Sequence, residues 1–204
     1  MKIDVYKDPF PYILVKDLYT QEEEDLIKKE CDFFLPSLTY NRPGGAIDVD
    51  TGQSLKKNRG VFLDDVWAIH RELSYIIRVS RKLFTLLEEQ KEKIGHDNWF
   101  FKNLLSNVDN TLISYYEDND HYLPHKDLGL YTVLTWFYKE PKSFTGGDFL
   151  FPDYDIRFEC KNNLTIIFPS MITHAVENVK VDDDRLGQGF GRWTLTQIVN
   201  VKNS

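Results

Sequence analysis

The segment 115–129, YYEDNDHYLPHKDLG, contains two residues whose types and spacing suit metal binding. His125 and Asp127 are separated by one residue, and on an extended chain such residues project to the same face. An imidazole and a carboxylate could therefore enter one cavity and bind one metal ion. Because His-x-Asp pairs also arise by chance in a sequence with 32 acidic residues, this pair alone is a weak signal.

The natural third ligand is His174, on a segment far along the chain. Pro124 would disrupt a helical turn joining His121 to the His-x-Asp pair, so we expect His121 to be a solvated loop residue or a fringe contact. His70 and His96 lie on or beside a predicted helix, without ligand partners at metal spacing. Two imidazoles and one carboxylate leave three octahedral positions open, which is typical of non-haem Fe(II) oxygenases, whereas zinc sites favour three histidines or cysteine-containing sets.

Arg192, in the run GRWTLTQ, is a candidate anion-binding residue. It lies on a predicted strand with Thr194 and Thr196 on the same face. An inward-facing guanidinium costs free energy unless an anion meets it, and its fork of donors suits a carboxylate. The anion that fits is the distal carboxylate of 2-oxoglutarate, whose 2-oxo acid end would take two open metal positions and leave the last for dioxygen. The alternative is a surface salt bridge.

Composition limits the class of protein. The chain has 204 residues, of which 42% are hydrophobic, so it can bury one substantial core and does not require two. There are 25 basic and 32 acidic residues, and the formal net charge is -7. This charge works against sequence-independent binding to phosphate backbones, so we expect no nucleic-acid partner.

The two cysteines, Cys31 and Cys160, lie in apolar segments and show neither CxxC nor zinc-type spacing. We expect them to be small buried residues in a reduced, intracellular setting. The N-terminal segment has no basic stretch leading into an apolar run, and no long uncharged apolar run occurs elsewhere. These features predict a soluble cytoplasmic protein without a membrane partner.

Helical patterns dominate the first half of the chain. The run Thr20 to Glu23 matches the S/T-x-x-E pattern and predicts a helix that continues to about residue 34. Apolar residues recur at helical spacing over 64–95, which predicts one long helix or two joined helices, and a shorter helix is expected over 98–105.

Between these helices, residues 37–58 contain three glycines and few large apolar side chains, which is typical of a long surface loop. Long loops in compact domains are often lids or binding loops, and the alternative is disorder. We expect the part over 40–58 to act as a lid.

After residue 110 the sequence changes to short segments rich in β-branched and aromatic residues, separated by clusters of Gly, Pro, Asn and Asp. Seven or eight such strands at even spacing predict a sandwich or barrel such as a jelly roll, with the helices packed on one sheet. We expect a single domain over 1–204, with helical support and the lid loop in 1–108 and the β core in 109–204.

Five segments together resemble the prolyl-4-hydroxylase-like Fe(II)/2-oxoglutarate dioxygenases. In chain order they are DPFPYILVKDLYTQEEEDLI, YYEDNDHYLPHKD, FTGGDFLF, NNLTIIFPSMITHAVENV and GRWTLTQ. The resemblance covers most of 110–200, and the opening segment resembles the lead-in of small microbial and viral members. It implies a double-stranded β-helix that binds Fe(II) through His125, Asp127 and His174 and anchors 2-oxoglutarate on Arg192, with ascorbate as a further cofactor.

The resemblance also implies roles for residues around these. Tyr115 matches a tyrosine that hydrogen-bonds the co-substrate in the family, and the alternative is a core aromatic residue. Thr194 matches a small or hydroxyl-bearing position beside the anchor. Gly146 and Gly147 match paired glycines that permit a tight turn between strands.

One departure concerns the anchor, because VKVDDDRLGQGF separates the distal histidine from Arg192 more widely than the family does. Arg185 is closer to the usual spacing and is a rival anchor. We favour Arg192 because a strand follows it, whereas Arg185 lies in an acidic, glycine-rich segment.

These features predict an enzyme that hydroxylates a C–H bond and releases succinate and CO2. Asp127 favours hydroxylation over halogenation, because a halide would need the coordination position of its carboxylate. The resemblance favours a peptidyl proline in a peptide or protein substrate, while free amino acids and other small molecules stay open. A nucleic-acid demethylase is disfavoured by the charge and by the spacing of Arg185 and Arg192. A non-catalytic metal- or ligand-binding jelly roll is the alternative from another class.

Overall fold

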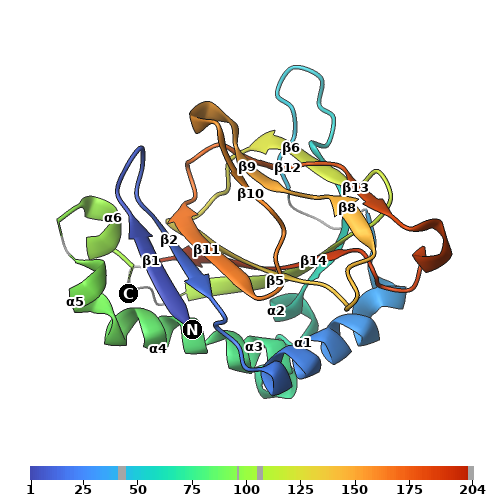
Figure 1. Cartoon of the computed structure of the whole chain (residues 1–204), viewed down its shortest axis with the longest axis horizontal. Coiled ribbons are helices and arrows are strands. Elements are labelled where there is room, and N and C mark those ends of the chain that lie inside the picture. Colours follow the sequence, from blue (N-terminus) through green and yellow to red (C-terminus); the bar gives the residue numbers. More distant parts are fainter. Residues whose placement is uncertain (41–44, 96, 105–107, 202–204) are drawn as a thin grey trace.

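The computed structural model describes residues 1–40, 45–95, 97–104 and 108–201. Its centre is a sandwich of two antiparallel β-sheets, and helices cover the outer face of the larger sheet (Figure 1). The arrangement is therefore three layers: helices, major sheet and minor sheet.

The major sheet has seven strands. In spatial order they are β1 (Lys2–Tyr6), β2 (Tyr12–Lys16), β11 (Leu164–Pro169), β7 (Tyr131–Phe137), β14 (Arg192–Asn200), β5 (Val108–Tyr116) and β4 (Arg59–Phe62). This sheet is covered on both faces. Every residue of β7 is therefore buried, and buried and exposed positions do not alternate along this strand.

The minor sheet has five strands and faces the inner side of the major sheet. In spatial order they are β10 (Ile156–Phe158), β9 (Phe149–Phe151), β12 (His174–Val176), β6 (His121–His125) and β3 (Lys56–Lys57). A separate two-stranded sheet pairs β13 (Val179–Val181) with β8 (Phe144–Gly146).

The helices are α1 (Gln21–Phe34), α2 (Leu63–Val66), α3 (Tyr75–Ser80), α4 (Lys82–Glu89), α5 (Lys91–Ile94) and α6 (Trp99–Lys102). Short 3-10 turns occupy Leu35–Ser37, Arg71–Leu73, Pro152–Tyr154 and Asp183–Arg185. Among the described residues, no helix is long and apolar enough to cross a membrane.

The start of α1 is as predicted. The Thr20 side chain accepts from the Glu23 amide and the Glu23 side chain accepts from the Thr20 amide, so two otherwise unpaired amides are satisfied reciprocally. The short helix expected over 98–105 begins at the Asn98 cap and ends at Lys102, and residue 105 lies outside the described residues.

The prediction of one or two long helices over 64–95 is wrong. The segment is broken into α2, a 3-10 turn, α3, α4 and α5. Ser74 ends the 3-10 turn in an extended conformation and caps α3 by accepting from the Ile77 amide. Three residues of the apolar pattern, Val66, Ile69 and Leu73, are exposed rather than packed on the sheet.

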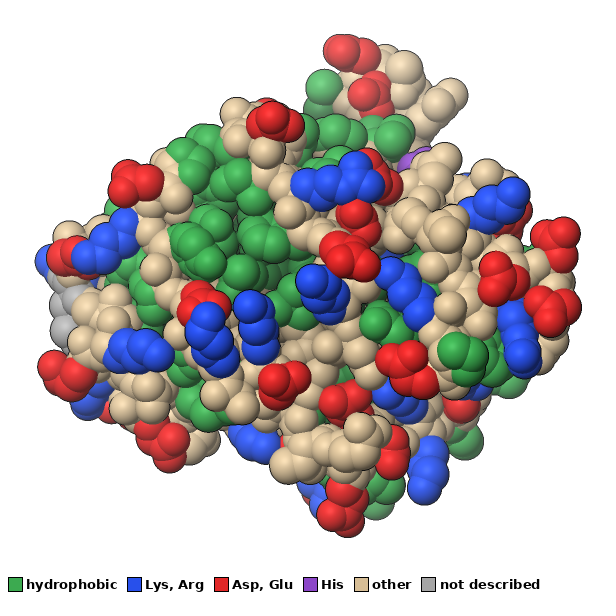
Figure 2. All heavy atoms as spheres, viewed as in Figure 1, with side chains coloured by type: hydrophobic (Ala, Val, Ile, Leu, Met, Phe, Trp, Pro, Cys, Tyr) green, Lys and Arg blue, Asp and Glu red, His purple; other side chains and the backbone are tan. Residues whose placement is uncertain are grey.

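Two apolar clusters hold the layers together. The first lies between the helices and the major sheet and includes Ile27, Leu83 and Val133. The second fills the space between the two sheets and includes Trp136, Phe149 and Phe168. Figure 2 shows hydrophobic side chains gathered where the space between the sheets reaches the surface, between β2 and β9.

Cys31 and Cys160 are buried, free thiols, as expected. The segment expected to be a surface loop over 37–58 contains β3, and residues 46–55 form a hairpin-like projection with a bridge between Ile47 and Ser54. Residues 41–44 of the expected lid lie outside the described residues.

Candidate metal and co-substrate site

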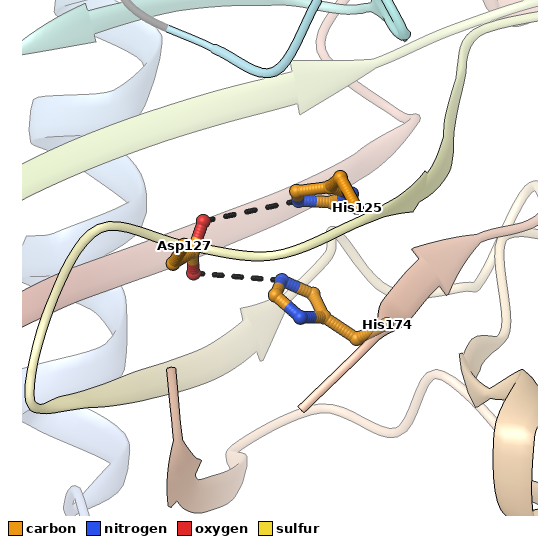
Figure 3. Close-up of side chains that lie close together, drawn as sticks. All are labelled: His125, Asp127 and His174. Carbon is orange, nitrogen blue, oxygen red and sulfur yellow. Dashed lines mark ion pairs between the residues drawn. The ribbon is translucent and has the colours of Figure 1, made fainter. Parts of the chain in front are cut away.

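The three predicted metal ligands converge at the inner face of the minor sheet (Figure 3). His125 ends β6 and His174 begins β12, and the two residues are directly opposite in the antiparallel pair. Asp127 follows β6 and turns its carboxylate back toward both rings. One ligand atom from each of the three lies within 4.8 Å of the others, and within the described parts of the chain no other group of three candidate ligands does so.

Both imidazoles direct the same nitrogen into the site. His125 Nδ1 lies 2.8 Å from the Leu123 carbonyl and His174 Nδ1 lies 2.9 Å from the Ile172 carbonyl. A carbonyl accepts only from N–H, so each Nδ1 carries a proton, and in a neutral ring each Nε2 then presents a lone pair. His125 Nε2 lies 3.8 Å from Asp127 Oδ1 and His174 Nε2 lies 3.4 Å from Asp127 Oδ2.

The electrostatic setting keeps His125 neutral and Asp127 ionised. Burial, followed by the neighbouring His174, lowers the pKa of His125 from 6.5 to about 3. Burial alone would raise the pKa of Asp127, but interaction with His174, followed by interaction with His125 and Thr132, outweighs burial and leaves that pKa below 3.8. Two neutral imidazoles and a carboxylate form the protonation state that binds a divalent metal ion.

Hydroxyl groups orient the Asp127 carboxylate. Thr132 donates to Asp127 Oδ2 at 2.8 Å, so the hydroxyl of Ser170, 2.9 Å from Thr132, must donate to Thr132 in turn. The Asp127 amide also donates to the Ser170 carbonyl at 3.0 Å. The segment that leads to His174 thus also holds the main chain and, through Thr132, the side chain of Asp127.

Arg192, the first residue of β14, is fully buried beside this group of ligands. Its Nη1 donates to the Thr194 hydroxyl, whereas Nε and Nη2 have no hydrogen-bond partner. Its guanidinium carbon lies 4.9 Å from the Tyr116 ring centroid and 5.6 Å from that of Trp136. Within the described residues no carboxylate forms an ion pair with Arg192, so a buried cation presents two unsatisfied donors.

Two neighbours define the position of Arg192. A Cβ at Gly147 would lie 2.9 Å from Arg192 Cδ, so the absence of a side chain there makes room for the arginine stem. The Cys160 thiol interacts with the guanidinium, but burial raises the pKa of that thiol despite the charge of Arg192. At neutral pH Cys160 is therefore uncharged and does not neutralise Arg192.

The ligands and Arg192 line one cavity of about 80 Å³, enough for several water molecules. Its walls come from both sheets and include Ser114, Tyr116, Thr194 and Thr196, with Phe62 and Gly45 among the remaining lining residues. The cavity therefore combines three candidate metal ligands with a buried guanidinium in a single, largely apolar space.

Similar solved structures include three prolyl hydroxylases. The viral collagen prolyl hydroxylase of Paramecium Bursaria Chlorella virus-1, solved with 2OG, has a TM-score of 0.59 at 13% identity, covering 94% of this chain and 96% of its own. A Pseudomonas putida prolyl-4-hydroxylase has a TM-score of 0.60 at 12% identity, covering 94% and 93%. A Trichoplax adhaerens prolyl hydroxylase, in complex with a hypoxia inducible factor peptide, has a TM-score of 0.62 at 10% identity, covering 93% and 83%.

This chain shares the fold of these solved structures. The double-stranded β-helix with helices on one sheet, expected from the sequence, is confirmed. At these identities the likeness establishes the fold and leaves the activity to the site itself. Sequence comparison finds no matching family model and no matching curated protein.

In this fold, Tyr115 is not brought to the cavity. Its side chain lies on the opposite face of β5, in the cluster shared with the helices. Its hydroxyl donates to Glu117 at 3.1 Å and accepts from the Gly191 amide at 3.0 Å. The structure therefore places Tyr115 as a core aromatic residue, and the adjacent Tyr116 lines the cavity instead.

The other candidates are placed as follows. Arg185 pairs with Asp184 and stacks on the Phe190 ring, away from the cavity lining. His121 lies on β6 rather than in a loop, with Nδ1 directed to the Asn119 carbonyl. His70 is exposed beside Glu72, and His96 lies outside the described residues.

Sequence reasoning missed three hydroxyl-bearing residues that line the cavity: Ser114, Tyr116 and Tyr122. Ser114 and Tyr116 lie opposite Thr194 and Arg192 in the β5–β14 ladder, so knowledge of that pairing would have identified them. Tyr122 lies three residues before His125, where regular strand alternation would predict the opposite face.

Replacing Thr132 with Val should lower the affinity for Fe(II) roughly 10- to 100-fold, the usual cost of losing an outer partner of a metal ligand. Valine nearly matches threonine in shape but cannot donate to Asp127. The measurement is an anaerobic titration with Fe(II), or with Co(II) as a spectroscopic substitute. Thr132→Ser retains the hydroxyl and should bind nearly as the wild type, so equal losses in both variants would contradict the role of this hydrogen bond.

Acidification should destabilise the metal-free protein partly through His125. An unfolded imidazole takes up a proton near its usual pKa of 6.5, whereas the folded ring does so only near 3. The unfolded state therefore binds more protons between these values, and the contribution of His125 to the free energy of unfolding falls as the pH falls. The slope from one group is at most about 1.4 kcal/mol per pH unit. Denaturant unfolding across this range should show a smaller slope for His125→Gln than for the wild type, and equal slopes would refute the assignment.

Proposed function

We propose that this protein is an Fe(II)- and 2-oxoglutarate-dependent dioxygenase. The observation that carries the proposal is the shared cavity, in which His125, Asp127 and His174 face inward beside a buried Arg192 with unsatisfied donors. A structural metal site would need the ligands but not the buried cation. A site for a metal-chelating dianion needs both.

The residues that line the cavity fit both Fe(II) and 2-oxoglutarate. Two Nε2 atoms and one carboxylate suit Fe(II), and they leave half of an octahedral coordination sphere for other ligands. Arg192, with Thr194 beside it, would hold the distal carboxylate of 2-oxoglutarate, and Tyr116 and Ser114 provide hydroxyl groups in the same cavity. When bound, iron with 2-oxoglutarate and dioxygen supplies the oxidation of a C–H bond, with release of succinate and CO2.

The chain's own contribution is orientation and exclusion of water. The carbonyls of Leu123 and Ile172 fix the imidazole tautomers, and Thr132 fixes the carboxylate. The aromatic and aliphatic lining lowers the local dielectric, which strengthens the pairing of Arg192 with a carboxylate.

We further propose a peptidyl proline as the substrate. The support is the fold shared with prolyl hydroxylases, one of which is in complex with a peptide. The described part of the expected lid, 45–58, contributes Gly45 to the cavity wall, where an extended peptide would lie. A free amino acid or another small molecule is the alternative. Screening both classes for a gain of one oxygen by mass distinguishes them.

The activity is tested without a known substrate. Purified protein with Fe(II) and 2-oxoglutarate under anaerobic conditions should show the weak visible charge-transfer band of the chelate, and admission of oxygen should give succinate. A protein that shows neither band nor succinate would be a non-catalytic binding protein. Salt-dependent binding to single-stranded DNA would instead favour the demethylase alternative over the proline substrate.

The remaining expectations stay as predictions of this proposal. They are a cytoplasmic location, a single domain over 1–204 and stimulation by ascorbate. Addition of ascorbate to turnover assays tests the last of these, with a longer linear phase of succinate formation expected.

A further inference from the structure

Tyr122 connects the metal ligand His125 to the hairpin at 45–55. Its ring stacks on the His125 imidazole, with ring centroids 3.4 Å apart and an angle of 9° between the planes. Its hydroxyl accepts from the Ala46 amide at 2.7 Å. One side chain thus contacts both a metal ligand and the segment that contributes Gly45 to the cavity wall.

A β-bulge places Tyr122 on this face. On β12 the partners of His125 and Tyr122 are His174 and Val176, two residues apart, whereas on β6 the two residues are three apart. β6 therefore contains one extra residue, which reverses the alternation and turns both Tyr122 and His125 inward. Pro124, which has no N–H to donate, lies within this irregular stretch, as is usual for proline in a sheet.

The hairpin is attached to β6 at its base. Lys56 is opposite Tyr122 in the β3–β6 pair, and the Leu123 amide donates to the Leu55 carbonyl at 2.8 Å. The Leu55 amide donates to the Ala46 carbonyl at 3.0 Å, which closes the hairpin. Beyond this base the hairpin stands out from the body of the molecule (Figure 2), so the contacts at its base determine where Gly45 and Ala46 lie.

We propose that Tyr122 is a positioning residue with two separable roles. Its ring face holds the His125 imidazole in the orientation that binds metal, and its hydroxyl docks the base of the hairpin as a wall of the substrate-binding side. This inference rests on the proposed function, because it takes His125 to be a metal ligand. The stacking and the docking are both contacts of this chain alone.

The two roles are separated by Tyr122→Phe and Tyr122→Leu. Phenylalanine keeps the ring and loses the hydroxyl, and leucine loses both. Co(II), added anaerobically and followed by its visible spectrum, measures the metal site without turnover. Amide hydrogen exchange at 45–55 measures the docking.

The Tyr122→Phe variant should bind Co(II) with wild-type affinity and spectrum, while the Ala46 amide exchanges roughly three- to tenfold faster, the effect of one lost hydrogen bond. The Tyr122→Leu variant should show the faster exchange and also bind Co(II) roughly three- to tenfold more weakly, the effect of one lost aromatic contact. Tyr154→Phe, at an exposed tyrosine outside the cavity, is the matched control and should change neither quantity.

The proposal is overturned if Tyr122→Phe weakens Co(II) binding as much as Tyr122→Leu, or if it leaves the exchange of Ala46 unchanged. Wild-type Co(II) affinity in Tyr122→Leu would also refute it. If Tyr122→Leu does not fold, Tyr122→Met removes the ring while filling more of its volume. Failure of the wild type to bind Co(II) would overturn the proposed function instead, and the exchange measurement would still test the docking.

Discussion

Replacing Asp127 with Ala should abolish succinate formation and lower the affinity for Fe(II) by more than about 100-fold, because loss of an outer partner alone costs 10–100-fold. Asp127 is the only carboxylate in the ligand group, and both imidazoles face it. Without it, the site offers two neutral nitrogens to a divalent ion. Anaerobic metal titration and a coupled succinate assay measure the two effects.

Lys126→Ala is the matched control for this variant. Lys126 lies between the two ligands in sequence but is exposed, so its removal should leave both metal affinity and turnover near wild type. Succinate produced at the normal rate by Asp127→Ala would contradict the assignment of the ligand. Equal losses in both variants would indicate that the loop, rather than the carboxylate, had been damaged.

Replacing Arg192 with Met should separate co-substrate binding from metal binding. The affinity for 2-oxoglutarate should fall roughly 30-fold or more, since removing one partner of a buried, hydrogen-bonded charge pair costs about 2–5 kcal/mol. The affinity for Fe(II) should stay near wild type, because Arg192 is not a ligand. Titration of the anaerobic charge-transfer band measures the first quantity, and Co(II) binding measures the second.

The same substitution should not destabilise the protein in the absence of 2-oxoglutarate. A buried guanidinium without an anion destabilises the fold, so Arg192→Met should leave the free energy of unfolding unchanged or raise it, by up to about 4 kcal/mol. Added 2-oxoglutarate should then stabilise the wild type but not the variant. Arg185→Met is the control, because Arg185 lies outside the cavity lining. A loss of 2-oxoglutarate affinity in Arg185→Met alone would make it the anchor.

The three candidate metal ligands could be predicted from sequence because the chemistry of metal binding is restrictive. Few residue types bind Fe(II), and a His-x-Asp pair needs only an extended chain to share a face. Arg192 was found by the same alternation along β14, where Thr194 and Thr196 line the cavity with it. The order of the five segments along the chain, rather than any single motif, predicted that they belong to one fold.

The choice between Tyr115 and Tyr116 could not be made from sequence. Strand alternation identifies an inner face only when the other face is polar, and here the last six residues of β5 are all buried. One face meets the helices and the other meets the minor sheet. Pairing with β14, a contact between segments far apart in the chain, decides which tyrosine enters the cavity.

The interruption of the helix predicted over 64–95 also could not be read from the spacing of apolar residues. Helical spacing of apolar residues predicts a helix but not its continuity. The side chain of Ser74 accepts from the Ile77 amide and competes with continuation of the preceding turn. The hydrophobic Ile69 and Leu73 then remain exposed, although they match the pattern.

His125 and His174 belong to the minor sheet, Arg192 belongs to the major sheet, and Asp127 lies in the connection between them. A molecule held by the metal ligands at one end and by Arg192 at the other would therefore link the two sheets of the sandwich. β6 and β12 are only five and three residues long, so they have few ladder bonds of their own. The resistance of the two sheets to separation would thus depend on the bound molecule as well as on contacts within the polypeptide.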